Sequence, residues 1–181
     1  MVIQEARIMS EKVVSRVKEH FGNFVREGGS TPLGEYFIRM EREKWFECVK
    51  FLRDDPDCLF DHFIDLTVVD WPEKEERFEV VLHLRSMKHN HRIRVKTNLP
   101  SQNPEVSSLT PLYKGANWFE REAYDMYGVI FKGHPDLRRI LLWEGFEGHP
   151  LRKDYPKTKR QCPIPFREDY PRQPKPFKER S

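Results

Sequence analysis

The chain has 181 residues, a formal net charge of +3 and a mean hydropathy of −0.77, which fits one domain or one domain with an extension. No run approaches the ~18 apolar residues of a membrane-spanning helix, and the N-terminus lacks the apolar stretch of a secretory signal, so we expect a mature cytosolic protein. Its three cysteines, Cys48, Cys58 and Cys162, show neither a C-x-x-C pair nor zinc or iron–sulfur spacing. Composition therefore argues against a secreted disulfide scaffold, a membrane-spanning protein and an obvious metalloprotein.

The first 58 residues predict two helices and a strand. Ser10 is a suitable N-cap for a helix whose apolar residues fall at 13, 14, 17 and 21. A loop is expected over residues 23–34, followed by a strand at residues 36–40, where apolar residues alternate. The second helix carries apolar residues at 45, 48, 49 and 52 and ends before Pro56.

Residues 59–128 predict three strands and then two helices. One strand covers residues 59–71, and the alternation in 78–84 and 93–95 predicts an antiparallel hairpin around a turn at 86–90. The charged run at 73–77 predicts a surface turn. Asn103-Pro104 predicts the start of a third helix, interrupted at Pro111, and a fourth helix runs from about residue 115 to 127 and stops at Gly128. This order predicts an α+β fold in which helices cover an antiparallel or mixed sheet.

The last 31 residues differ from the rest in charge and proline content. Residues 151–181 hold ten Lys/Arg and four Asp/Glu, a net of +6, whereas residues 1–150 have a net of −3. Seven of the 14 prolines lie between 150 and 181, and so much proline with so few aliphatic residues cannot form a helix or a core. Widely spaced aromatic residues favour docking over simple disorder. We therefore expect a core domain over 1–150 and an extended basic, proline-rich tail over 151–181 that lies on a partner.

The helix predicted over residues 115–127 divides into two faces. Its apolar residues, which should face the core, are Ala116, Phe119, Ala123, Met126 and Tyr127. Arg121, Glu122 and Asp125 fall on the opposite side, beside Trp118. A solvated face, a partner interface and a carboxylate metal site are the alternatives. The metal site lacks a further E-x-x-H partner, and a tryptophan among charges favours the interface.

This helix and the residues after it carry a motif, Glu120-Arg121-Glu122-x-x-Asp125-Met126-Tyr127, six residues, His134, three residues, Arg138-x-Ile140-Leu141. The motif resembles the signature of the 30 kDa-type subunit family, the C-type subunits, of respiratory NADH:quinone oxidoreductase, or complex I. The Asn117-Trp118 lead-in and residues 145–156 are also similar to that family.

The resemblance implies a supporting, non-catalytic subunit of the peripheral arm, on the cytoplasmic side of the inner membrane and attached to the membrane only through the complex. It implies subunits D, B and I of complex I as neighbours. The first of these, the large quinone-site subunit, is the expected main partner, and the tail is expected to lie on it. The resemblance also implies no catalytic, cofactor or metal site on this chain, whereas the holoenzyme uses FMN, iron–sulfur clusters and quinone.

The residues that we expect at the partner interface come from this motif and its continuation: Trp118, Glu120, Arg121, Glu122, Asp125, His134, Arg138, Arg139, His149, Arg152, Asp154 and Tyr155. One of Arg138 and Arg139 is expected to be buried at a subunit contact. For His134 and His149, each followed by proline, a role in shaping the backbone is the simpler alternative.

Two other functions stay open. The first is the equivalent subunit of photosynthetic NDH-1, F420H2 dehydrogenase or membrane-bound hydrogenase, because this chain would never contact the electron donor. The second, more remote, is a basic single-strand nucleic-acid-binding protein, suggested by a pI of about 8.7 and the aromatic residues of the basic tail. The slightly acidic body and the lack of a recognisable RNA-binding motif argue against nucleic acid as a partner.

Overall fold

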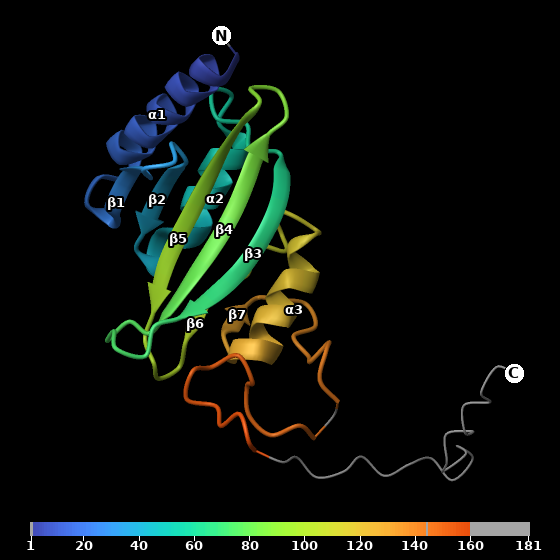
Figure 1. Ribbon diagram of the computed structural model, residues 1–181. Helices are drawn as coiled ribbons and strands as arrows, with labels where there is room; N and C mark the ends of the chain where they lie inside the picture. Colours follow the sequence, from blue (N-terminus) through green and yellow to red (C-terminus); the bar gives the residue numbers. More distant parts are fainter. Residues whose placement is uncertain (1, 144, 160–181) are drawn as a thin grey trace, which may run out of the picture.

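The computed structural model describes residues 2–143 and 145–159, with only the helical backbone described for residues 2–9. Its main elements are α1 (Val2–Phe21), β1 (Val25–Ser30), β2 (Tyr36–Met40), α2 (Trp45–Asp54), β3 (His62–Asp70), β4 (Phe78–Ser86), β5 (His91–Leu99), β6 (Glu105–Ser107), α3 (Ala116–Tyr127) and β7 (Ile130–Lys132). Short 3-10 turns, Gly22–Phe24 and Arg42–Lys44, precede β1 and α2. The described part of the chain has an α+β fold, as predicted (Figure 1).

A five-stranded mixed sheet forms the centre of the fold, with strand order β1-β2-β5-β4-β3. Strands β2 and β5 are parallel, and the other neighbours are antiparallel. The predicted hairpin is confirmed: β4 and β5 pair from Phe78↔Leu99 to Ser86↔His91. A second, two-stranded parallel sheet joins β6 to β7.

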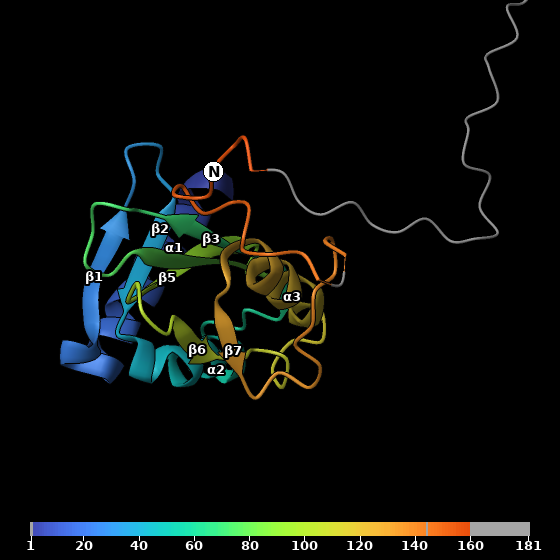
Figure 2. The ribbon, with the colours of Figure 1, turned by 90° about the horizontal axis from the view of Figure 1, so that it is seen from below.

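The core lies on one face of the large sheet, because apolar residues alternate along its strands. Val80, Leu82 and Leu84 of β4 point to this face and are buried. Helix α2 covers it, as Figure 2 shows from below the molecule, with its four buried residues Trp45, Cys48, Val49 and Leu52. Helix α1 packs against β1, β2 and β5 through the apolar residues predicted from the sequence.

Helix α3 packs beside β3, at the edge of the sheet (Figure 1). Its predicted end is confirmed, since Gly128 adopts the left-handed conformation with φ of +74° and its N–H bonds the carbonyl of Tyr124. Two hydrogen bonds extend the pairing of the small sheet at its ends. The Pro104 carbonyl accepts the Ile130 N–H at 2.8 Å, and the Ser108 N–H donates to the Lys132 carbonyl at 2.8 Å. Pairing of β6 with β7 therefore brings the chain that precedes α3 next to the chain that follows it.

Three local predictions were wrong. The first helix begins at Val2, and Ser10 is a buried residue inside it. Residues 23–34 contain β1, which lacks apolar alternation and is stabilised by pairing with β2. Asn103-Pro104 leads into β6 and not into a helix, since Asn103 has φ of +51° and the following residues pair with β7. Among the described helices, none has the length and apolarity needed to cross a membrane.

Candidate functional site

The motif residues gather around α3 and the irregular residues 133–143 and 145–155 that wrap it, which we call the wrapped segment. Two carboxylates of α3, Glu120 and Asp125, have 0% exposure. The helical wheel placed Asp125 on the exposed face, and that prediction was wrong. Both acids were also expected at a partner interface, whereas both bind groups of their own chain.

Asp125 is the acceptor for four donors of the segment after β7. Its Oδ2 accepts the backbone N–H groups of Ile140, Leu141 and Leu142 at 3.1, 2.9 and 2.9 Å. Its Oδ1 accepts Nη1 of Arg139 at 2.7 Å. Burial alone would raise the pKa of Asp125, but the N–H groups and the guanidinium outweigh it and hold this pKa below its ordinary value. The carboxylate thus folds residues 139–142 around itself.

Arg121 does not form the i, i+4 pair with Asp125 that their spacing suggested. Its Nε and Nη2 donate to the carbonyls of Arg138 and Arg139, both at 3.2 Å. Its guanidinium lies 5.2 Å from the ring centre of Trp118, which is 61% exposed. Arg139 is mostly buried but pairs within the chain, and Arg138 stays exposed. Arg121 of α3 therefore fixes residues 138 and 139 of the wrapped segment against the helix.

His134 shapes the turn that leads into this segment. Its Nε2 lies 3.2 Å from the Asn117 carbonyl and its Nδ1 accepts the Asp136 N–H at 3.0 Å. This arrangement assigns the Nε2–H tautomer of a neutral ring. Both ring nitrogens serve the backbone, in line with the simpler alternative for this residue.

The segment after Gly148 caps the C-terminal end of α3. The last carbonyls of a helix lack partners within it. Here His149 Nδ1 lies 2.9 Å from the carbonyl of residue 125, and the Leu151 N–H donates to the carbonyl of residue 126 at 3.2 Å. Arg152 Nε donates to the carbonyl of residue 127 at 2.6 Å. Gly128 provides the space for these two side chains, because a Cβ there would lie 2.5 Å from His149 and 2.6 Å from Arg152. Burial lowers the pKa values of His149 and Arg152.

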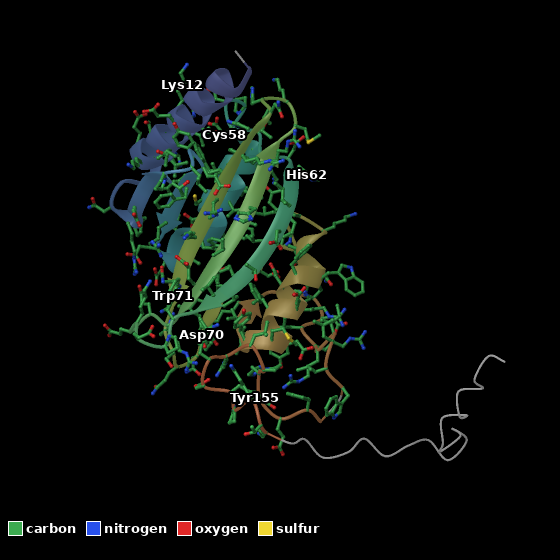
Figure 3. All side chains as sticks on the ribbon, in the orientation of Figure 1. Lys12, Cys58, His62, Asp70, Trp71 and Tyr155 are labelled. Atoms are coloured by element: carbon green, nitrogen blue, oxygen red, sulfur yellow. The ribbon has the colours of Figure 1, made fainter. Side chains whose placement is uncertain are left out.

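A second ion cluster attaches the same segment to the β3–β4 turn, and sequence reasoning missed it. Arg77 makes a bidentate pair with buried Asp70 at 2.6 and 2.8 Å and reaches Asp154 at 2.8 Å. Asp70 also accepts the Lys153 N–H at 2.7 Å. Figure 3 shows Asp70 at the end of the sheet that is nearest to Tyr155. Arg77 belongs to the run that predicted only a surface turn, and nothing in the local pattern indicated its distant partner.

Residues 151–155 thus contact the body, although the expected tail began at 151. Tyr155 stacks with Phe146 at 6.1 Å between ring centres, and Phe146 meets Trp143 edge-on at 4.8 Å. Residues 160–181, where most of the expected tail falls, lie outside the described residues.

Glu120 points to the opposite side of α3 and holds the β6–α3 connection. Its Oε1 accepts the Leu109 N–H and its Oε2 the Ser108 hydroxyl, both at 2.6 Å. Burial raises the pKa of Glu120 to about 7, against the opposing effect of these two donors. In the described ranges, no group of three or more His, Cys, Asp and Glu side chains could hold a metal ion.

The outer surface of α3 and the wrapped segment carries large exposed apolar side chains among its charged ones. Four large side chains project from α3 and the wrapped segment, and we call them the α3 surface: Trp118 (61% exposed), Leu141 (65%), Trp143 (37%) and Leu151 (48%). Each lies close to an anchored position; the Leu141 and Leu151 N–H groups bond Asp125 and Met126, for example. Glu122, the remaining predicted residue of the helix, is exposed beside them. The charges of the motif mostly face inward, and apolar groups face outward.

Known proteins have sequences similar to that of this chain. Residues 38–161 match the family described as respiratory-chain NADH dehydrogenase, 30 Kd subunit. Proteins of Sinorhizobium medicae and Caulobacter vibrioides, both named as the C-type subunit of NADH-quinone oxidoreductase, are 50% and 53% identical to this chain. The matches cover 81% and 72% of this chain and 72% and 66% of those proteins.

Two solved structures share the fold. A chain named Nqo5, a trypsin-resistant fragment (1-134), superposes with a TM-score of 0.62 at 27% identity, over 71% of this chain and 99% of that one. A chain of the membrane-bound sulfane sulfur reductase, an archaeal respiratory membrane complex, gives 0.68 at 23% identity, over 82% and 86%.

The first prediction concerns Asp125. Asp125→Ala should lower the free energy of unfolding in urea by about 3–5 kcal/mol, because Arg139 and three N–H groups lose a buried acceptor. Glu122→Ala removes an exposed carboxylate from the same helix and should change it by less than about 0.5 kcal/mol. Equal effects of the two substitutions would contradict this assignment.

The second prediction compares two glycines with positive φ. Gly128→Ala should lower the melting temperature at least about 4 °C more than Gly133→Ala. Both positions have left-handed backbone, with φ of +74° and +83°, but a Cβ at Gly133 meets nothing within 4 Å. Matching losses would show that His149 and Arg152 do not need this space.

The third prediction is a pH dependence caused by Glu120. Between pH 4.5 and about 7 the unfolded chain has lost a proton that native Glu120 retains. The unfolded state then binds fewer protons, so this group makes stability fall as pH rises, by up to about 1.4 kcal/mol per pH unit. Glu120→Gln removes the effect. The free energy of unfolding of the variant minus that of the wild type should therefore increase as the pH is raised from 5 to 7.5. A difference that stays constant over this range would exclude the raised pKa.

Proposed function

The chain belongs to the family of the 30 kDa subunit of respiratory-chain NADH dehydrogenase, and from this premise we propose that it is the C-type subunit of a proton-translocating NADH:quinone oxidoreductase. Its task is to hold sister subunits in place without catalysing a step itself. The observation that carries this proposal is the α3 surface, whose exposed aromatic and aliphatic side chains stand on a frame fixed by Asp125.

Such a surface has the character of a protein-binding site. Large exposed apolar patches mark interaction surfaces, and tryptophan is enriched among the residues that dominate binding energy. The internal ion pairs and helix caps fix the loops before a partner arrives, which reduces the entropy lost on binding. We propose the large quinone-site subunit as the principal partner, with subunits B and I as further neighbours.

The C-terminal residues extend the same interface in this proposal. Contacts of residues 149–155 with α3 and with Asp70 fix the point from which the chain continues. From there the basic, proline-rich residues would lie along the large quinone-site subunit as an extended strap. FMN, the iron–sulfur clusters and quinone are bound by sister chains, and this subunit remains on the cytoplasmic side of the inner membrane through the complex alone.

The curated relatives favour NADH as the electron donor. The relatives that are 50% and 53% identical are named as subunits of NADH-quinone oxidoreductase, whereas the likeness to the archaeal complex, at 23% identity, shows the fold only. We therefore prefer this enzyme to the related donor-specific complexes.

Recovery of sister subunits from native membranes tests the proposal. The tagged full-length chain should recover them together with NADH:quinone oxidoreductase activity, and the chain purified alone should hold neither flavin nor iron. Trp118→Ala combined with Leu141→Ala should reduce recovery about tenfold or more, since loss of two central anchors typically costs at least ~2 kcal/mol.

Leu33→Ala is the matched control for this experiment. Leu33 is 84% exposed on the β1–β2 turn, away from α3, and its loss should leave recovery unchanged. A wild-type chain that brings down no sister subunit, or that oxidises NADH alone, would refute the proposed function. Equal losses from Leu33→Ala and the double variant would refute the α3 surface as the interface.

A further inference from the structure

The second face of the large sheet carries charged and polar side chains. No helix is drawn in front of β3, β4 and β5 in Figure 1, where this face is seen. The alternate residues of these strands that point away from the core include His62, Thr67 and Arg92, all of them exposed. In the described part of the chain the end of this face near His62 and Arg92 therefore remains open, whereas Glu79, Val81 and Asn98 further along it are buried.

Strand register places the basic residues of this face in rows. His62 pairs with Arg85, and Arg85 pairs with Arg92, so three basic side chains form one row across β3, β4 and β5. The next row runs from Asp65 through His83 to Arg94. Figure 3 shows His62 at the end of β3 opposite Asp70, far from the segment that wraps α3.

Most cations of this face are neutralised within the chain. Arg39 and Lys96 pair with Glu79 at 2.7 and 3.3 Å. Arg94 pairs with Glu35 at 2.8 Å, and its Nε donates to His83 Nε2 at 2.8 Å, so His83 carries no proton there. These contacts use the charges near the middle of the sheet.

Arg85 and Arg92 are different. Arg85 donates to the side-chain oxygen of Asn90 at 2.7 Å, and neither arginine contacts a carboxylate among the described residues. They are direct cross-strand neighbours, and like charges directly opposite each other destabilise a sheet. An anion placed between them would remove this repulsion and accept hydrogen bonds from both guanidinium groups.

The surface beside this pair is hollowed and chemically mixed. A depression of about 440 Å³ is lined by Arg92, Arg94 and His83, together with Glu35, Tyr36 and Ile64. Its apolar wall suits a polypeptide, and its polar wall supplies donors. Asp65 in the neighbouring row repels a continuous polyanion such as nucleic acid or an anionic lipid layer. A single carboxylate at the arginine pair avoids that repulsion.

We infer that this end of the sheet face binds an acidic segment of a sister chain, with one of its carboxylates between Arg85 and Arg92. The inference rests on the proposed function, because it assumes that the chain works within a complex. It assigns a second docking surface, at the end of the molecule away from the α3 surface. The repulsive pair is then a specificity device, since it is relieved only by a partner with a correctly placed acid.

Removing the pair should separate binding from folding. Arg85→Gln combined with Arg92→Gln should leave the melting temperature of the full-length chain unchanged or slightly higher, because the cross-strand repulsion disappears. The same variant should be retained about tenfold more weakly in the complex on washing with rising salt. Lys12→Gln combined with Lys50→Gln removes two exposed charges from α1 and α2 and should leave retention unchanged.

Cross-linking identifies the acid. Arg92→Lys introduces an amine that a carbodiimide joins to a nearby carboxylate, whereas the wild-type guanidinium does not react. In the assembled complex, mass spectrometry should find position 92 joined to an aspartate or glutamate of a sister chain.

Four results would overturn the inference while leaving the proposed function intact: cross-links from position 92 only to Glu35 or Asp65, no cross-link in an intact complex, loss of retention equal to that of the lysine control, or wild-type binding to phosphatidylglycerol vesicles that the glutamine variant loses. Failure of the proposed function would look different, since the wild-type chain would then recover no sister subunit.

Discussion

The buried carboxylate of Asp125 is the interaction on which the rest of the site depends. Three consecutive N–H groups and one guanidinium converge on it, so a segment without regular secondary structure acquires a fixed shape. Because the donors compensate the loss of water, the charge is retained inside the protein. The interaction joins α3 to a segment about 15 residues further along the chain, and neither has a reason to adopt this arrangement alone.

The fixed segment gives the surface its character. Arg121 and the caps at the C-terminal end of α3 place polar groups inward, and the Asp70–Arg77 pair ties the same segment to the sheet. Leu141 and Trp118 are consequently exposed at defined positions. In the proposed role such a surface matters more than reactive groups, because the subunit would contribute by placing other chains. The open sheet face adds a charged surface of a different chemistry.

Sequence reasoning predicted the elements that have a clear apolar periodicity, and it missed those that depend on tertiary contacts. The alternation of β4 and the terminal Gly128 depend on local periodicity and backbone geometry, and both were confirmed. The burial of Asp125 was missed, because a helical wheel assigns a carboxylate to water unless a distant partner is known. Strand β1 was missed for the same reason, since its pairing with β2 and not its own composition makes it a strand. The motif drew attention to α3 and the residues after it, while the role of each charge depended on contacts between distant residues.

Amide hydrogen exchange in the isolated full-length chain tests the central claim most directly, because it reports on the N–H groups that Asp125 accepts. If the frame forms before assembly, the amides of Ile140, Leu141 and Leu142 exchange as slowly as those of α3, and Asp125→Asn accelerates them selectively. Exchange at the rate of an unstructured peptide, with protection appearing only once sister chains are bound, would mean that the partner and not the carboxylate shapes this segment.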